Sequence, residues 1–162
     1  MNLTGQFLVS VPSLEDERFF KTVIFMCAHS KEGAMGIIIN KKIDYDLYPD
    51  LLEQLGIDKP LGSKKLFLRY GGPVESGRGF VLHTDEVVRK ESITIDKGIV
   101  LTSTAEFFDD LARGQGPKNS ILALGYAGWE PGQLENEINA NSWMNLSADM
   151  GFLFGEEVSN KW

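Results

Sequence analysis

The side chains best suited to chemistry are one cysteine and two histidines. Cys27 and His29 lie two residues apart in the segment 21–29, KTVIFMCAH. Residues two apart on a strand share a face, so this spacing could form a thiolate–imidazole pair. The segment is apolar on both faces, however, and a cysteine in such a strand is usually a small buried hydrophobe. We therefore predict that the strand is central and that Cys27 is buried and inert.

The histidines could instead serve a metal site or a hydrolase. His29 and His83 each lie near the end of a predicted strand, and adjacent strands could bring them together. Two histidines do not complete a metal site, and no third ligand is identifiable. Ser76, His83 and Asp85 are the residue types of a hydrolytic triad, but no G-x-S-x-G elbow surrounds Ser76. The sequence therefore predicts no metal, and the missing nucleotide fingerprints predict no cofactor.

The stretch from residue 66 to residue 86, LFLRYGGPVESGRGFVLHTDE, indicates two strands joined by a turn and a loop. Gly71, Gly72 and Pro73 force the chain to leave the sheet, because proline donates no hydrogen bond and glycine permits φ values that other residues resist. Residues 76–79, SGRG, are predicted to form the loop that re-enters the second strand.

Two arginines lie on either side of this turn. Arg69 precedes the turn and Arg78 lies in the predicted loop. Guanidinium groups beside exposed backbone N–H groups could hold a small anion. The alternative is that both side chains are solvated surface charges.

A second glycine-rich segment, Gly125 to Trp129, follows a short apolar strand at residues 121–124. Tyr126 and Trp129 could form a ligand platform, although aromatic residues between small ones more often pack over a neighbouring strand. We expect this segment and the turn at residues 71–73 to pack together at the rim of the sheet. Trp129 is the large side chain available to cover the bare glycine backbone.

The remaining elements are predicted from apolar periodicity. Further strands are expected at residues 6–11, 34–40, 92–95, 99–102, 143–146 and 150–154. Helices are expected at residues 44–56, at residues 103–114 after a capping box at 103–106, and from Pro131, with Leu134 and Ile138 facing inward and Glu135 and Glu137 facing water. Strands in hairpins with short, irregularly placed helices indicate an α+β fold with a bent, mostly antiparallel sheet, rather than a doubly wound parallel sheet.

Length and charge limit the possible functions. The 162 residues suit a single domain spanning 1–162. The 16 basic and 23 acidic residues give a net charge of −7, so direct binding to nucleic acid is not expected. A single cysteine excludes an intramolecular disulfide, and the N-terminal residues lack the basic region and long apolar core of a secretory signal. No run approaches the roughly 20 apolar residues of a membrane span. We expect a cytoplasmic protein with no membrane association.

Three long motifs occur in order at residues 5–41, 70–83 and 123–138: GQFLVSVPSLEDERFFKTVIFMCAHSKEGAMGIIINK, YGGPVESGRGFVLH and ALGYAGWEPGQLENEI. Their content and order resemble the bacterial YqgE/AlgH family over almost the whole chain. The resemblance implies a compact α/β domain with a bent sheet forming a pseudo-barrel and short peripheral helices. It also implies a cytoplasmic protein of unassigned biochemistry, linked in some bacteria to transcriptional control of alginate synthesis.

The resemblance supplies no catalytic residue. Members of the family usually continue with a further helix past the position of Trp162, where this chain stops. We therefore expect the C-terminal edge of this chain to be less covered.

Two functions remain open. The first is a noncatalytic regulatory or protein-interaction domain, whose control of transcription is indirect and passes through a protein partner. The second is a small-molecule hydrolase that uses groups near His29 and His83. The missing catalytic fingerprints favour the first. The candidate surface site comprises His29, Arg69, Gly71, Gly72, Pro73, Arg78, His83, Tyr126 and Trp129.

Overall fold

The strands form one curled sheet in which almost all neighbours run antiparallel. The computed structural model describes residues 2–11, 19, 21–41, 68–96, 98–104, 107, 117, 119–147 and 150–154. Within these residues the strand order is β6-β7-β5-β8-β3-β2-β1-β9, and β4 pairs with β8 off this path. The strands are β1 (Gln6–Ser10), β2 (Val23–Ser30), β3 (Gly33–Ile38), β4 (Leu68–Tyr70), β5 (Val74–Thr84), β6 (Ile93–Asp96), β7 (Ile99–Thr102), β8 (Ser120–Trp129) and β9 (Trp143–Ser147). The described helices are α3 (Gln133–Asn139) and α4 (Met150–Leu153).

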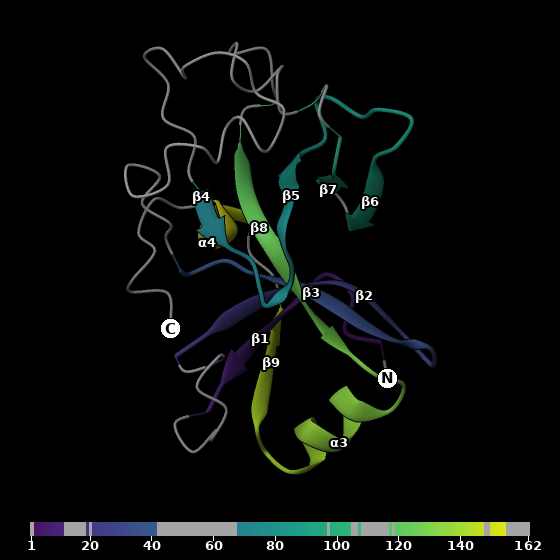
Figure 1. The fold of residues 1–162 in the computed structure, drawn as a ribbon, viewed down its shortest axis with the longest axis vertical. Helices are drawn as coiled ribbons and strands as arrows, with labels where there is room; N and C mark the ends of the chain where they lie inside the picture. Colours follow the sequence, from purple (N-terminus) through teal and green to yellow (C-terminus); the bar gives the residue numbers. More distant parts are fainter. Residues whose placement is uncertain are drawn as a thin grey trace.

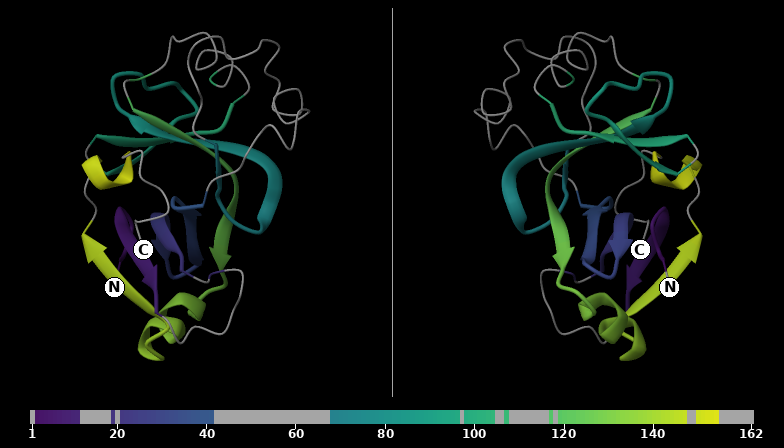
Figure 2. Two further views of the ribbon diagram at one scale, coloured as in Figure 1. Left: turned by 90° about the vertical axis from the view of Figure 1, so that its left-hand side faces the viewer. Right: turned by 90° about the vertical axis from the view of Figure 1, so that its right-hand side faces the viewer.

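Strand β8 belongs to both halves of the curl. Its residues 120–124 pair with β5, whereas its residues 127–129 pair with β3. Between the two parts lies Gly125, whose φ of 77° is in the left-handed region that favours glycine. Figure 1 shows β4 to β7 beside the first part of β8, and β1 to β3 beside its last part. The two halves face each other across the interior of a half-barrel (Figure 2), which fits the implied pseudo-barrel.

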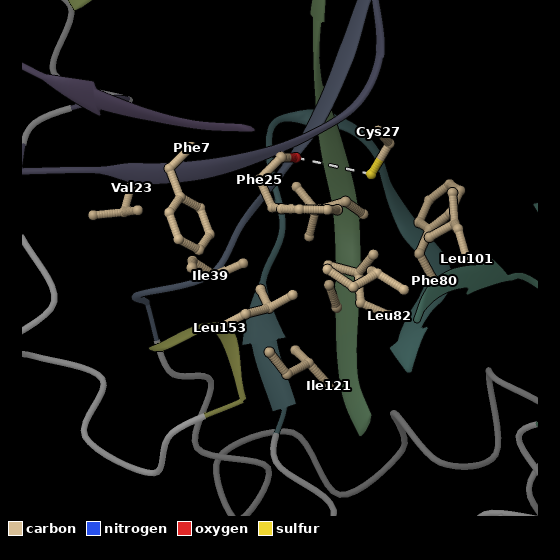
Figure 3. Packing of buried hydrophobic residues seen from close by; sticks show 13 residues of the cluster. Phe7, Val23, Phe25, Cys27, Ile39, Phe80, Leu82, Leu101, Ile121 and Leu153 are labelled. Carbon is tan, nitrogen blue, oxygen red and sulfur yellow. Dashed lines mark hydrogen bonds between the residues drawn. The ribbon is translucent and has the colours of Figure 1, made fainter. Parts of the chain in front are cut away.

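The core has two clusters because alternate residues of β2 point to opposite faces of the sheet. Phe25 and Cys27 point into the curl, where they pack with side chains such as Leu82 of β5. Ile24 and Met26 belong to a second cluster, which also contains side chains of α3 and β9. Figure 3 shows the first cluster, in which side chains of β1, β2, β5, β7 and β8 meet a leucine of α4. The sheet is thus packed on both faces where β2 crosses it.

The predicted hairpins are confirmed. Strand β2 pairs antiparallel with β3, and β6 pairs antiparallel with β7. All residues of β2 except Ala28 and Ser30 are buried, as expected for a central strand. The strands predicted near the N-terminus and at residues 143–146 are present as β1 and β9.

Three element predictions are wrong. Residues 76–79 lie within β5, and residues 125–129 continue β8 instead of following its end. The glycines there mark irregular strand positions, including a register shift between Val74 and Gly79, because glycine in a strand can signal a bulge as well as a loop. The third error is at residues 150–153, which form α4. A short apolar run does not distinguish a helix from a strand by periodicity alone.

The helix predictions have different outcomes. The helix at residues 44–56 and most of the helix at 103–114 lie outside the described residues. Phe107 of the latter is helical, and its N–H donates to Thr104 Oγ1 at 3.3 Å, so Thr104 provides the cap. Ser103, the expected cap, donates its hydroxyl to the Gly79 carbonyl at 2.6 Å. The helix predicted from Pro131 begins at Gln133.

Candidate functional site

A groove of about 1100 Å³ lies where β3, β5 and the last part of β8 meet. The ring of Tyr126 packs edge-on against Phe80 within it, with 5.7 Å between the ring centroids. Val74 and Ile93 are 37% and 59% exposed, so apolar surface faces solvent. The apolar and aromatic lining residues include Ala34, Met35, Val74, Phe80, Ile93, Leu101, Tyr126 and Trp129.

The charged side chains that line the groove are mostly acidic: Glu32, Glu75, Arg78, Glu91 and Glu130. Arg78 is exposed, and its Nη1 lies 3.5 Å from Glu75 Oε2. Its Nε donates to a serine hydroxyl at 3.3 Å, and its guanidinium carbon lies 4.9 Å from the centroid of a phenylalanine ring. The single groove arginine is therefore already engaged by its neighbours.

The turn at Gly71 and Gly72 packs directly against β8. The N–H of Gly71 donates to the Leu124 carbonyl at 2.8 Å. A Cβ on Gly71 would meet the carbonyl oxygen of Gly125, and a Cβ on Gly72 would meet the peptide that follows Tyr126. The expected contact between the two glycine-rich segments is therefore confirmed. The atoms that a Cβ on either glycine would approach most closely all belong to β8, and none of them belongs to Trp129.

The remaining candidates at the turn, Pro73 and Arg69, lie outside the groove. Pro73 is half-buried, and Arg69 is only 2% exposed. Burial lowers the pKa of the Arg69 guanidinium. Arg69 does not line the groove, whereas Arg78 does. The alternative that both arginines are solvated surface charges fits the exposed Arg78 but is wrong for Arg69, because β4 lies beside β8 inside the fold.

His29 is buried and connects the N-terminal residues to helix α3. Its Nδ1 accepts a hydrogen bond from the Leu3 N–H at 3.0 Å, and its Nε2 lies 3.1 Å from Glu135 Oε1. Because Nδ1 must be unprotonated to accept, Nε2 carries the proton and donates it to the carboxylate. This hydrogen bond lowers the pKa of the Glu135 carboxyl. Both ring nitrogens are thus occupied.

His83 is fully buried, and its two ring nitrogens are also occupied. Its Nδ1 donates to the Thr84 carbonyl at 2.8 Å, so Nε2 of the neutral ring accepts from the Thr102 hydroxyl at 2.8 Å. Thr102 Oγ1 in turn lies 2.7 Å from Ser92 Oγ, and Ser92 is the donor because the threonine proton is already used. The ring stacks on Phe107 with centroids 4.6 Å apart. Burial is the main cause that lowers the pKa of His83.

The structure does not bring the two histidines together. His29 is on β2 and His83 is on β5, and strands β3 and β8 lie between them in the sheet. The expectation of adjacent strands is wrong because β8, which is distant in sequence, pairs between β3 and β5. Among the described residues, no three His, Cys, Asp or Glu side chains are grouped to hold a metal ion. Cys27 is buried as predicted, and burial raises the pKa of its thiol.

Trp129 and Trp143 share one acceptor on helix α3. The indole N–H groups of Trp129 and Trp143 donate to Glu137 Oε1 at 3.1 and 2.9 Å, and Gln133 Nε2 donates to Oε2 at 2.9 Å. Glu135 and Glu137 were expected to face water, but both are half-buried and hydrogen-bonded. A buried indole N–H usually needs a hydrogen-bond acceptor, so the tryptophans in the sequence could have indicated a buried polar partner.

Neither described helix is long and apolar enough to cross a bilayer.

Known proteins match this chain over nearly its full length. The AlgH-like family model matches residues 7–162. A UPF0301 protein of Rhodopseudomonas palustris strain BisB18 is 49% identical, over 99% of this chain and 79% of the relative. A UPF0301 protein of Nitrobacter hamburgensis is 48% identical, over 99% of this chain and 78% of the relative.

Two solved structures share the fold. A protein from Corynebacterium diphtheriae matches with a TM-score of 0.69 and 23% identity, over 98% of this chain and 80% of that protein. At this identity the match supports the fold alone. The AlgH protein from Pseudomonas aeruginosa, solved in solution, has a TM-score of 0.82 at 34% identity, over 96% of this chain and 82% of that protein. Because the family model, the relatives that match 99% of this chain, and the fold all agree, this chain belongs to the AlgH-like family.

Proposed function

We propose that this protein is a noncatalytic regulatory protein that binds a partner protein in the groove between β3, β5 and β8. The observation that carries the proposal is the groove itself, which is lined by apolar and aromatic side chains together with exposed charged ones. Aromatic and apolar side chains surrounded by a polar rim are typical of protein interfaces. The volume of about 1100 Å³ is slightly above the usual range for small-molecule pockets, roughly 300 to 1,000 Å³.

The groups that a hydrolase would use do not support the alternative. His29 and His83 have hydrogen-bond partners at both ring nitrogens and lie on strands that are not neighbours. A general base must lie within hydrogen-bond reach of the proton that it abstracts from a bound substrate. Neither histidine lines the groove.

The regulatory part of the proposal rests on the resemblance to the YqgE/AlgH family. The net charge of −7 and the acidic groove disfavour contact with DNA phosphates. We therefore propose that the protein regulates transcription indirectly, by binding a protein partner, and that it does so in the cytoplasm.

Site-specific photocrosslinking in cells tests this function. A photoreactive amino acid is placed at Ile93 in the groove and, as a control, at Leu146 on β9, which is 50% exposed and does not line the groove. We expect a discrete crosslinked partner from position 93 and not from position 146. Equal adducts from both positions, or none from position 93, would contradict the proposal.

A groove-filling variant makes the test specific. A Cβ at Gly128 would lie 3.5 Å from the Tyr126 ring and 3.8 Å from Val74, which are ordinary contacts. Gly128→Leu should therefore fold and occupy part of the groove, and we expect it to abolish the crosslink from position 93. Gly128→Ala is the matched control that leaves most of the groove open. A crosslink that survives Gly128→Leu in folded protein would place the partner elsewhere.

A further inference from the structure

We infer that the groove binds a lysine- or arginine-containing segment of the partner, with apolar residues beside the cationic side chain. This inference rests on the proposed function, and it adds the chemistry of the partner. Two observations support it: the negative charge of the residues that line the groove, and the apolar side chains among them.

The groove has an excess of negative charge. Its lining includes four glutamates and one arginine, and the arginine is already paired with Glu75. The other three, Glu32, Glu91 and Glu130, are exposed and have no ion-pair partner among the described residues. An acidic rim raises the local concentration of cationic ligands and favours their approach.

Two of these glutamates, Glu32 and Glu130, lie on backbone segments that run side by side at the groove. Ala34 of β3 is opposite Trp129 of β8, so the turn that contains Glu32 lies beside Glu130. A Cβ on Gly33 would lie 3.8 Å from the carbonyl carbon of Glu130, which shows how closely the two backbones approach. A lysine or arginine between the two side chains would interact with both and reduce their mutual repulsion.

The floor accounts for the apolar part of the segment. Met35, Phe80 and Tyr126 line the groove and are buried or half-buried, whereas its charged residues are exposed. Val74 and Ile93 add exposed apolar surface. The alkyl stem of a lysine or arginine can cover such surface while its charged end reaches the carboxylates. A purely polar basic segment would leave this floor exposed, and an acidic one would be repelled by the rim.

Short fluorescent peptides test the inference by anisotropy. One peptide carries lysines between leucines and valines, a second has glutamine at the lysine positions, and a third has glutamate there. We expect binding of the lysine peptide, weakened by added salt, and no measurable binding of the glutamate peptide. Equal binding of the lysine and glutamine peptides would overturn the inference.

Variants locate the binding and separate the two proposals. Glu32→Gln and Glu130→Gln should each weaken binding of the lysine peptide about two- to fivefold, as for exposed ion pairs. Asp85→Asn, the same change at an exposed acid outside the groove, should leave it unchanged. If Glu32→Gln and Glu130→Gln bind the lysine peptide as tightly as Asp85→Asn does, these two glutamates do not hold the cationic side chain and the inference is wrong. If the crosslink at position 93 still depends on Gly128, the groove remains the interaction site, and only the chemistry of the partner fails.

Discussion

Burial of the His83 ring links the stability of this protein to pH. Desolvation lowers the pKa of the imidazole from its usual 6.5, against smaller opposing effects of the Thr84 carbonyl and the Glu86 carboxylate. At mildly acidic pH the unfolded chain therefore binds a proton that the folded chain does not. The contribution of His83 to stability is complete above about pH 6.5 and is lost as the pH falls through the lowered pKa of the folded state.

We expect His83→Gln to flatten this dependence. The variant should lose about 1 to 3 kcal/mol at neutral pH, because Thr84 or Thr102 loses a buried hydrogen-bond partner. Urea unfolding between about pH 7 and about pH 5 should then show a smaller decline than in the wild type. Titration of Glu135 does not account for a loss of stability in this pH range, because the pKa of its carboxyl is lowered from 4.5. Parallel profiles for the two proteins would show that another group titrates.

Glu137 offers a second test at the level of a single side chain. Its Oε1 accepts from both Trp129 and Trp143. Glu137→Ala should leave two indole N–H groups without this acceptor, at a cost of about 1 to 3 kcal/mol for each that stays dry. Glu137→Gln retains an oxygen that can accept from both, so its loss should be smaller. Thermal unfolding followed by tryptophan fluorescence measures both, and an equal loss in the two variants would refute this role.

At the scale of elements, the contact between Gly72 and β8 predicts an asymmetry between two glycines. A Cβ at Gly72 meets backbone atoms of Tyr126 and Ala127, which cannot rotate away, and its φ of 153° is one that other residues rarely adopt. We expect Gly72→Ala to cost about 1 to 3 kcal/mol, as overpacking does. Gly128→Ala makes only ordinary contacts and should change the free energy of unfolding by less than about 0.5 kcal/mol. Chemical denaturation measures the free energy of unfolding of both variants. Similar losses in the two would mean that the backbone can shift to accommodate a Cβ at Gly72.

The same elements show how far the sequence alone leads. The hairpin of β2 and β3 follows from local alternation and a short turn, so it could be predicted. The length of β8 could not be predicted, because Gly125 and Gly128 are typical of a loop, whereas both lie within the strand and Gly125 adopts a positive φ there. Its pairing with β3, β4 and β5 is a long-range property that periodicity does not encode.

The candidate site divides in the same way. Arg78, Tyr126 and Trp129 are candidates by residue type, and all three line the groove. His29 and His83 are candidates by their chemistry, but their partners come from distant elements and hold them in structural roles. The glutamates of the groove cannot be predicted as site residues, because an exposed acid is unremarkable until the fold places several together.

For the whole molecule, the central position of β8 has a consequence for folding kinetics. Residues 120–129 complete both halves of the curl, so neither half can close its sheet before this late part of the chain arrives. Contacts that join residues so far apart in sequence require the closure of long loops, which slows folding. The N-terminal strands of a chain still being synthesised therefore lack the strand against which they close, and their apolar faces remain open to other chains until β8 has been made.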